Sequence, residues 1–381
     1  MSMDKTTNDP VELTKRLIGL STARPHISPA DIKRLERMVH DAGFIVDRVN
    51  DGGRCDSITG DHLLAQCGKG DVHLAFISHY DVVPAGEGWK TKPFTPTVID
   101  DVLYGRGAAD MKSGLAAQII AGKELADLGM KVSLFIAGDE ETYSDGMPAL
   151  LARNNDKIHY AICGEPTSKS VAGDTIKVGR RGVVQGEIKV KGKQGHAAYV
   201  DPHDMLNVMR VVGGLLPALQ SLPGDQGNAD FPPSTCNVTY LSGGDGSYNV
   251  VPGSATLRFD ARLCPETSAA QFETKLRMTL DEHVPSYELE ITKSTPHFHT
   301  TDNVFRELVS RSIGKVTGIR PAYSCDGGTS DARFFAAAGI PVLEVGVPQG
   351  NMHGVDEFVR LVDIEKLREI YVAIGKNLLK K

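Results

Sequence analysis

The chain has 381 residues with a formal net charge of −6, and 41% of its residues are hydrophobic and 24% charged. Its length exceeds the usual span of one domain, so two domains are expected, each able to bury a core of normal size. The acidic balance excludes the basic footprint of a nucleic-acid-binding protein.

Several features bear on where the chain works. The polar segment 1–10 lacks the apolar core of a secretory signal, and no run of about 18 apolar residues predicts a membrane span. Six cysteines are scattered without a C-x-x-C pair: Cys55, Cys67, Cys163, Cys236, Cys264 and Cys325. In a chain of this length the pattern is typical of reduced thiols, so we expect a cytoplasmic protein.

The first part of the chain alternates predicted helices and strands. Residues 10–42 have helical character, interrupted between Pro25 and Pro29. Residues 112–128 carry apolar side chains at helical spacing and end before Gly129. Short apolar runs of strand length occur at residues 72–78, 132–137 and 159–163. The alternation predicts an α/β architecture with a mixed, mostly parallel sheet.

The middle of the chain has a different order of elements. Apolar and polar residues alternate at 184–190, which predicts a strand with one exposed face. The further predicted elements are a helix at about 203–219, strands near 235–241 and 255–263, a helix at about 268–283 and a strand at 287–291. The order β-α-β-β-α-β is that of a ferredoxin-like α+β unit.

The α/β pattern returns after residue 296, with a predicted strand at 341–345 and a final helix from Asp363. We therefore expect a catalytic domain of residues 1–181 and 296–381, interrupted by an inserted ferredoxin-like domain of residues 182–295.

Acidic and histidine side chains repeatedly follow the apolar strands. His79 and Asp81 follow the first, Glu140 and Glu141 the second, Glu165 the third and His353 the strand at 341–345, while Asp110 stands just before the helix at 112–128. Open α/β sheets bind ligands at the carboxyl ends of their strands, so these side chains are expected to converge.

Each of these residues alone also has a purely structural interpretation. His79 and Asp81 would form a polar strand end, and Asp110 would cap a helix N-terminus. The Glu140–Glu141 pair would be a solvated loop, and Glu165 before Pro166 would start a turn. Only their joint placement after strands favours a functional cluster.

The residue types match the ligands that zinc prefers, namely histidine nitrogen and carboxylate oxygen. Two metal ions that share one carboxylate need about five protein ligands. The set that meets this number is His79, Asp110, Glu141, Glu165 and His353, which leaves Glu140 as a base. Asp81 lies two residues from His79, on the same side of a strand, where it would orient the imidazole.

Six motifs together resemble the co-catalytic zinc amidohydrolases, a family that includes acetylornithine deacetylase, succinyl-diaminopimelate desuccinylase and the carboxypeptidase G type. They are Ser-His-Tyr-Asp-Val-Val-Pro at 78–84, Leu-Tyr-Gly-Arg-Gly-Ala-Ala-Asp-Met-Lys at 103–112, Gly-Asp-Glu-Glu at 138–141, Gly-Glu-Pro-Thr at 164–167, Gly-His-Ala at 195–197 and Met-His-Gly at 352–354. The resemblance extends from about residue 10 to the end of the chain.

The resemblance implies a role for each residue of the cluster. Asp110 would bridge two zinc ions, with His79 and Glu165 on one ion and Glu141 and His353 on the other. Glu140 would be the general base, and Asp81 would orient His79. The resemblance also implies a cis peptide bond after Asp110, and cobalt as a substitute for zinc.

The resemblance further implies a homodimer, with the inserted domain serving dimerisation and acting as a lid. His196 would reach the oxyanion in the other subunit, although a loop histidine is its structural alternative. Arg180 would bind a substrate carboxylate, with a surface arginine at a hinge as the alternative. Tyr199, Asn249, Arg262 and Thr329 are further substrate-binding candidates by the same analogy.

Segments 173–182, 231–234 and 327–331 lean toward the succinyl-diaminopimelate desuccinylases, whereas Tyr248 and Gln349 depart from that branch. We expect hydrolysis of an N-acyl amino acid, in particular N-succinyl-LL-2,6-diaminopimelate. The alternatives are an acetylornithine deacetylase or another deacylase, and a dipeptidase or carboxypeptidase that uses the same site. A catalytically silent small-molecule-binding protein is the non-enzymatic alternative, against which the presence of Glu140 argues. Gly-x-Ser-x-Gly, His-Glu-x-x-His and P-loop motifs are absent from the sequence.

Overall fold

The computed structural model describes residues 9–50 and 61–380. Residues 1–8, which make up most of the polar N-terminal segment, and Cys55 lie outside the described residues. The chain divides into two compact units, Met1–Val178 with Thr300–Ser324 and Ser330–Lys381, and Gly179–His299 with Cys325–Thr329. The expected functional division, a catalytic domain with an inserted dimerisation domain, stays a prediction.

A mixed eight-stranded sheet forms the centre of the first unit. Its strands, in spatial order, are β1 (Ile45–Asn50), β2 (Asp61–Cys67), β6 (Lys131–Ala137), β3 (His73–His79), β7 (Tyr160–Cys163), β18 (Val342–Glu344), β8 (Thr175–Lys177) and β17 (Ala322–Ser324). Strands β6, β3, β7 and β18 run parallel in the middle, whereas β1 and β2 pair antiparallel at one edge. Every residue of β3 is buried, as is typical of a strand covered on both faces. The sheet confirms the predicted fold class.

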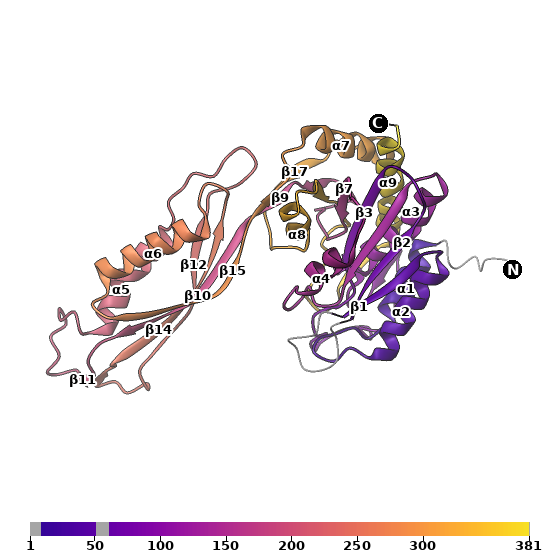
Figure 1. Cartoon of the computed structure of the whole chain (residues 1–381). Coiled ribbons are helices and arrows are strands. Elements are labelled where there is room, and N and C mark those ends of the chain that lie inside the picture. Colours follow the sequence, from indigo (N-terminus) through magenta and orange to yellow (C-terminus); the bar gives the residue numbers. More distant parts are fainter. Residues whose placement is uncertain (1–8, 51–60, 381) are drawn as a thin grey trace. The chain divides into compact units, whose positions relative to one another are not determined.

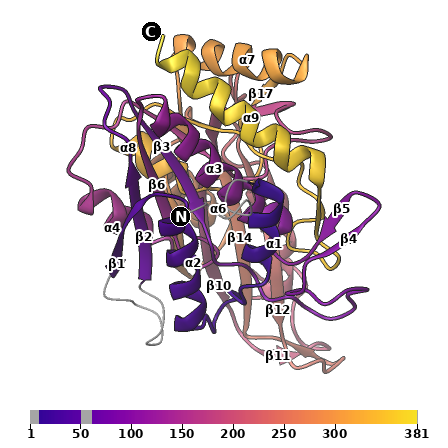
Figure 2. The same cartoon turned by 90° about the vertical axis from the view of Figure 1, so that its right-hand side faces the viewer.

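Helices cover both faces of this sheet. They are α1 (Pro10–Ile18), α2 (Pro29–Asp41), α3 (Ser113–Asp127), α4 (Gly146–Arg153), α7 (Asn303–Thr317), α8 (Ala332–Ala337) and α9 (Leu361–Leu378). Figure 1 shows α3 and α9 on one face and α4 and α8 on the other. In Figure 2, α9 crosses α3, which it contacts. A smaller sheet joins β4 (Thr97–Ile99), β5 (Val102–Tyr104) and β19 (Phe358–Arg360).

Local sequence signals explain where the first helices begin. Asp9 caps α1 by accepting hydrogen bonds from the amides of Val11 and Glu12, and Ser28 caps α2. Proline follows each cap, where its missing amide hydrogen costs nothing and its fixed φ suits the helix. The helical stretch predicted at 10–42 is therefore two helices separated by an irregular segment with turns, residues 19–28.

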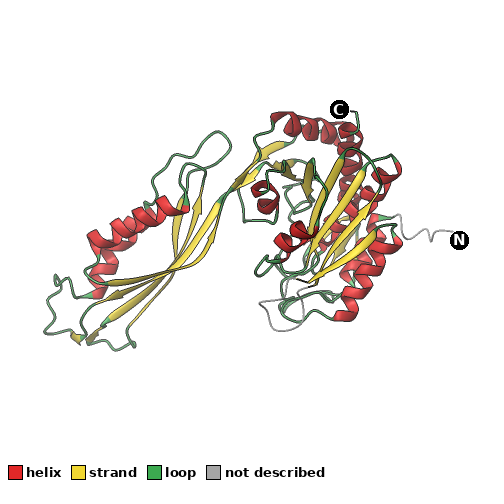
Figure 3. Cartoon of the chain, in the orientation of Figure 1, coloured by secondary structure: helices red, strands yellow, loops and turns green. Residues whose placement is uncertain are grey.

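The second unit contains an antiparallel sheet of β12 (Thr235–Gly243), β14 (Ser254–Leu263), β10 (Gly182–Lys191) and β15 (Tyr287–Thr295), in this spatial order. Helices α5 (Val208–Gln220) and α6 (Ala269–His283) cover one face, as Figure 3 shows. Leu215, Leu257 and Leu276 belong to the core between helices and strands. This arrangement confirms the predicted ferredoxin-like unit.

Short strands complete the second unit: β9 (Gly179–Arg180) pairs with β16 (Phe298–His299), and β11 (Gly195–His196) pairs with β13 (Val250–Val251). Helix α5 begins five residues later than predicted, because Asn207 caps it through the amides of Met209 and Arg210. Across the described parts of the chain, no helix combines the length and apolar character needed to span a bilayer.

Candidate metal centre

The register of the parallel strands explains why the acidic loops meet. His79 is the last residue of β3 and pairs with Ala137, the last residue of β6. On the other side of β3, Ile77 pairs with Cys163 at the end of β7. The loops that follow β3, β6 and β7 therefore leave the same edge of the sheet, and they carry Asp81, the Glu140–Glu141 pair and Glu165.

Asp110 lies between two histidines, His79 and His353, that are far apart in the sequence. Its Oδ1 is 3.2 Å from His79 Nε2, and its Oδ2 is 3.2 Å from His353 Nε2. Glu165 Oε1 is 3.6 Å from His79 Nε2, and Glu141 Oε1 is 3.0 Å from His353 Nε2. Each Asp110 oxygen thus faces one imidazole, and one further carboxylate stands beside each imidazole.

Glu140 also belongs to this cluster. One donor atom from each of His79, Glu140 and Glu165 lies within 4.8 Å of the others, and the same holds for His79, Asp110 and Glu141. Imidazole nitrogens and carboxylate oxygens at these separations are a donor set that fits divalent cations such as zinc. The side chains of the cluster are therefore chemically suited to bind a metal ion.

The backbone around Asp110 is irregular. It forms a short turn, η2 (Ala108–Lys112), preceded by Gly107 at φ +82°. A Cβ at Gly107 would lie 2.8 Å from Val82 Cγ1, so only glycine fits there. The Asp110–Met111 peptide bond is cis, in agreement with the implication of the resemblance.

Asp81 contacts His79, as the sequence predicts, and it also makes contacts that the sequence does not predict. The Nδ1 atom of His79 lies 2.9 Å from the Asp81 carbonyl oxygen and 3.5 Å from the Asp81 carboxylate. That carboxylate accepts hydrogen bonds of 3.2 Å from the amides of both Glu140 and Glu141. Buried Arg24 lies on its other side, with Nε 3.4 Å from Oδ2. The Asp81 carboxylate thus holds the Glu140–Glu141 turn, and its carbonyl orients His79.

The charges of the cluster shift its pKa values strongly. Hydrogen bonds to Asp110 and Glu141 raise the pKa of His353 to about 10. Burial lowers the pKa of His79, but its bonds to Asp110 and Asp81 outweigh burial and hold that pKa well above 6.5. Burial also raises the pKa of both Glu140 and Glu165 well above the ordinary glutamate value. Protons are therefore held where a cation would bind.

A further carboxylate near the cluster escaped the sequence analysis. Asp331 is 2% exposed, and neither of its carboxylate oxygens has a hydrogen-bond partner among the described residues. Arg333 Nη1 is 3.7 Å from Asp331 Oδ1, and burial raises the pKa of Asp331 to about 7. The negative charge of Asp331 adds to the effect of burial in raising the pKa of Glu140. Asp331 directly follows Thr329 and Ser330 in segment 327–331, and this position in the sequence could have marked it as a candidate.

Three candidates of the second unit lie together at the β11–β13 end. His196 is exposed on β11, and its ring centroid is 5.6 Å from that of Tyr199, which is 90% exposed. The carbonyl of Asn249 accepts a 2.8 Å hydrogen bond from the amide of Ala197. All three side chains belong to surface loops or a two-residue strand.

The remaining candidates lie at the β9 end of the second unit. Arg180 is buried on β9 and donates from Nη1 to the carbonyl of Asp326 at 3.0 Å. Arg262, near the end of β14, donates from Nε and Nη2 to Asp260 at 2.6 and 3.0 Å. Thr329 is half-buried. Both arginines are therefore engaged by the protein itself.

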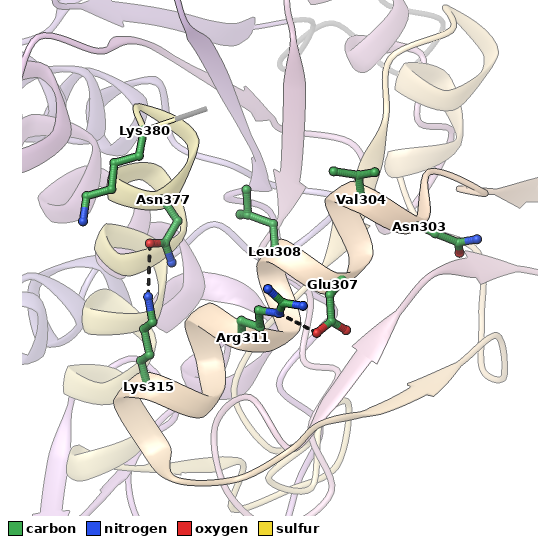
Figure 4. A pocket seen from close by; sticks show the side chains of 8 residues that line it. All are labelled: Asn303, Val304, Glu307, Leu308, Arg311, Lys315, Asn377 and Lys380. Carbon is green, nitrogen blue, oxygen red and sulfur yellow. Dashed lines mark hydrogen bonds and ion pairs between the residues drawn. The ribbon is translucent and has the colours of Figure 1, made fainter.

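A surface hollow of about 630 Å³ lies between α7 and α9 (Figure 4). It is lined by Asn303, Val304, Glu307, Leu308, Arg311, Lys315, Asn377 and Lys380. Two of its charged groups are paired within it, Arg311 with Glu307 at 2.7 Å and Lys315 with Asn377 at 3.5 Å. None of the candidate ligands lines it, so it is separate from the metal centre.

Known proteins resemble this chain over most of its length. The model of peptidase family M20/M25/M40 matches residues 75–377. A succinyl-diaminopimelate desuccinylase of Rhizorhabdus wittichii is 38% identical over 378 residues, covering 97% of this chain and 98% of that protein. One of Delftia acidovorans is 37% identical, covering 95% and 96%.

Solved structures share the fold at low sequence identity. A tripeptidase of Staphylococcus aureus aligns with a TM-score of 0.80 at 20% identity, covering all of both chains. Human carnosine dipeptidase 1 aligns with a TM-score of 0.73 at 19% identity, covering 100% of this chain and 98% of that one.

The family match and the desuccinylase relatives indicate a hydrolase that acts on amide bonds, and the cluster of carboxylates and imidazoles fits the metal dependence of that family. The chain belongs to peptidase family M20/M25/M40, within which its sequence relatives include the desuccinylases named above.

Proposed function

We propose that the chain is a two-zinc deacylase of N-acyl amino acids and that its substrate is N-succinyl-LL-2,6-diaminopimelate. The observation that carries the proposal is Asp110, whose two oxygens each lie 3.2 Å from a different histidine. A carboxylate in that position suits a bridge between two cations. The desuccinylases at 35–38% identity over nearly the full length support the substrate.

The distances support one assignment of ligands to the two ions. His79, Glu165 and one oxygen of Asp110 would hold the first ion, and Glu141, His353 and the other oxygen the second. Bound zinc supplies a Lewis acid for the scissile carbonyl and lowers the pKa of bound water. Nitrogen and oxygen donors favour zinc, with cobalt as a substitute.

Glu140 would act as the general base. It would accept a proton from the attacking water and donate that proton to the leaving amine. The Asp81 carboxylate restrains the backbone of Glu140 through a 3.2 Å hydrogen bond, so the base is presented from a fixed turn. A raised pKa, caused mainly by burial, suits a group that must both accept and return a proton.

The second unit would serve as the dimerisation and lid domain. Strand β12 lies at an edge of its sheet, and its residues Tyr240 and Leu241 are 44% and 48% exposed. An exposed edge strand with apolar side chains favours pairing with a second copy of the chain. In such a homodimer, His196 would stabilise the oxyanion in the other subunit.

Arg180, Tyr199, Asn249, Arg262 and Thr329 remain proposed substrate-binding residues. Arg180 and Arg262 would have to exchange their present protein partners for a substrate carboxylate. The cytoplasmic location expected from the cysteines also remains a prediction.

The test is hydrolysis of a substrate panel by the zinc-loaded protein. The panel contains N-succinyl-LL-2,6-diaminopimelate, N-acetylornithine, other N-acetyl amino acids and dipeptides. The first of these should be cleaved with the highest kcat/KM. Preference for a dipeptide would favour a peptidase. Preference for an acetyl group would indicate that Tyr248 and Gln349, which depart from the desuccinylase branch, determine the specificity. Fewer than about one zinc per chain with no hydrolysis would favour a silent binding protein.

A further inference from the structure

One buried carboxylate holds the backbone of the Asp110 segment. Glu357 is 1% exposed. Its Oε1 accepts hydrogen bonds from the amides of Ala109 and Asp110 at 2.9 and 3.0 Å. Its Oε2 accepts from the amide of Gly107 at 2.9 Å and from Arg106 Nη1 at 2.7 Å. Charge-assisted bonds of this length are strong, so four donors fix this segment against one side chain.

Arg106 extends the same connection to the His353 segment. Its guanidinium is also buried, and its Nη2 lies 3.2 and 3.1 Å from the carbonyl oxygens of Pro84 and Ala85 and 3.4 Å from that of His353. The ring of Trp89 covers it, 5.3 Å from Cζ. The planar guanidinium of Arg106 thus contacts both the loop after Asp81 and the loop that carries His353.

The His353 loop needs such outside contacts because its backbone is strained. Asn351, His353 and Asp356 have φ values of +58°, +64° and +54°. These values lie in the left-handed region, which residues other than glycine rarely adopt. Conformations of this kind persist only where the surrounding structure enforces them. The bond from Arg106 to the His353 carbonyl is one such restraint.

We infer that Arg106 and Glu357 are a positioning pair that sets the separation of Asp110 and His353. The pair contacts the backbone of both residues, Glu357 at the Asp110 amide and Arg106 at the His353 carbonyl. This inference rests on the proposed function, since it assigns the pair to the two-zinc site. The ion held by Asp110, Glu141 and His353 depends on both contacts, whereas the ion held by His79, Asp110 and Glu165 depends on one.

The experiment is zinc titration of the metal-free full-length chain by calorimetry, comparing the wild type with Glu357→Gln and Arg106→Lys. The Glu357→Gln change turns an amide toward backbone donors, and the Arg106→Lys change keeps the charge but removes the fork. We expect the affinity for one zinc ion to fall by about 10- to 100-fold and the affinity for the other to fall by less. At saturating zinc, kcat should recover while KM stays unchanged.

Asp363→Asn is the matched control. Asp363 is 3% exposed and accepts bonds from Arg360 Nε at 2.5 Å and from the Ala172 amide at 2.8 Å. It is thus a buried carboxylate paired with arginine and backbone in the same unit, but it contacts no candidate ligand. The change should lower the unfolding midpoint and leave both zinc affinities unchanged.

The outcomes separate the inference from the proposed function. Unchanged affinities in folded Glu357→Gln and Arg106→Lys chains would overturn the positioning role, and if the Glu357→Gln chain fails to fold, Arg106→Lys decides. A wild-type chain that binds a single zinc overturns the two-zinc proposal. The same two variants must then lower that one affinity, or the positioning role is overturned as well.

Discussion

At the residue scale, the site is a set of acids and imidazoles that share protons until a cation replaces them. Burial alone would neutralise these side chains, but Asp110 faces two imidazoles that lower its pKa against the effect of burial. Their mutual contacts therefore keep opposite charges together. Binding of metal must be coupled to loss of protons from His79 and His353.

Zinc binding should release protons, and zinc affinity should rise with pH up to about 10, the pKa of His353 in the metal-free chain. Because that pKa is raised, the stability that protonated His353 contributes is complete below 6.5 and is lost as pH rises through about 10. Calorimetry in buffers of different ionisation enthalpy counts the protons. His353→Ala should release fewer protons than the wild type, and an equal count would refute the coupling.

Glu140→Gln should keep both zinc ions but lower kcat by about 100- to 10,000-fold, because the water then lacks its proton acceptor. The adjacent residue offers the control, since Glu141→Gln should weaken zinc binding as well as turnover. Metal analysis and steady-state kinetics on both variants distinguish the two roles. Near-normal turnover in the Glu140→Gln chain would remove this residue from the mechanism.

At the element scale, the site depends on how closely the layers approach at the ends of β6, β3 and β7. Helix α3 packs so tightly on the segment after β7 that a Cβ at Gly114 would lie 2.5 Å from the Gly164 carbonyl oxygen. On the other side, a Cβ at Gly346 would overlap the carbonyl of Glu165. The backbone of Gly164 and Glu165 is thus held between Gly114 and Gly346.

Gly114→Ala should therefore destabilise the chain by about 1–3 kcal/mol and weaken zinc binding, because overpacking moves the segment that carries Glu165. Gly213→Ala is the control, since a Cβ at Gly213 on α5 would meet no atom within 4 Å. That change should leave zinc affinity unchanged and slightly favour the helix. Urea unfolding and zinc titration measure both effects, and equal behaviour of the two variants would contradict the packing argument.

At the scale of the whole molecule, the proposed residues belong to different units, Glu140 to the first and His196 to the second. A homodimer in which His196 serves the other subunit would make each site from two chains.

A mixture of His196→Ala and Glu140→Gln chains should recover activity that neither variant has alone. In a mixed dimer, one site combines an intact Glu140 with an intact His196, so a 1:1 mixture should regain about a quarter of the wild-type sites. Turnover is measured after unfolding and refolding the chains together. Absence of recovery, with mixed dimers detected by mass spectrometry, would exclude a role for His196 across the dimer.

The sequence by itself determined the features that short stretches encode. Apolar periodicity predicted the α/β layers and the ferredoxin-like unit, since burial of one face repeats every two or 3.6 residues. The positions of His79, Glu141 and Glu165 after strands also predicted that they converge. The helix predicted from about residue 203 begins at Val208 instead, because the Asn207 side chain caps it there.

Only the tertiary structure decided which backbone groups these side chains restrain. The hydrogen bonds of Asp81 to the Glu140–Glu141 turn, the pairing of Arg24 with Asp81, and the Glu357–Arg106 connection join residues that are far apart in the sequence. No local pattern marks such contacts, because they arise from the register of neighbouring strands and the paths of the loops between them. Periodicity records which side of an element is buried, whereas the partner of a buried charge depends on the whole fold.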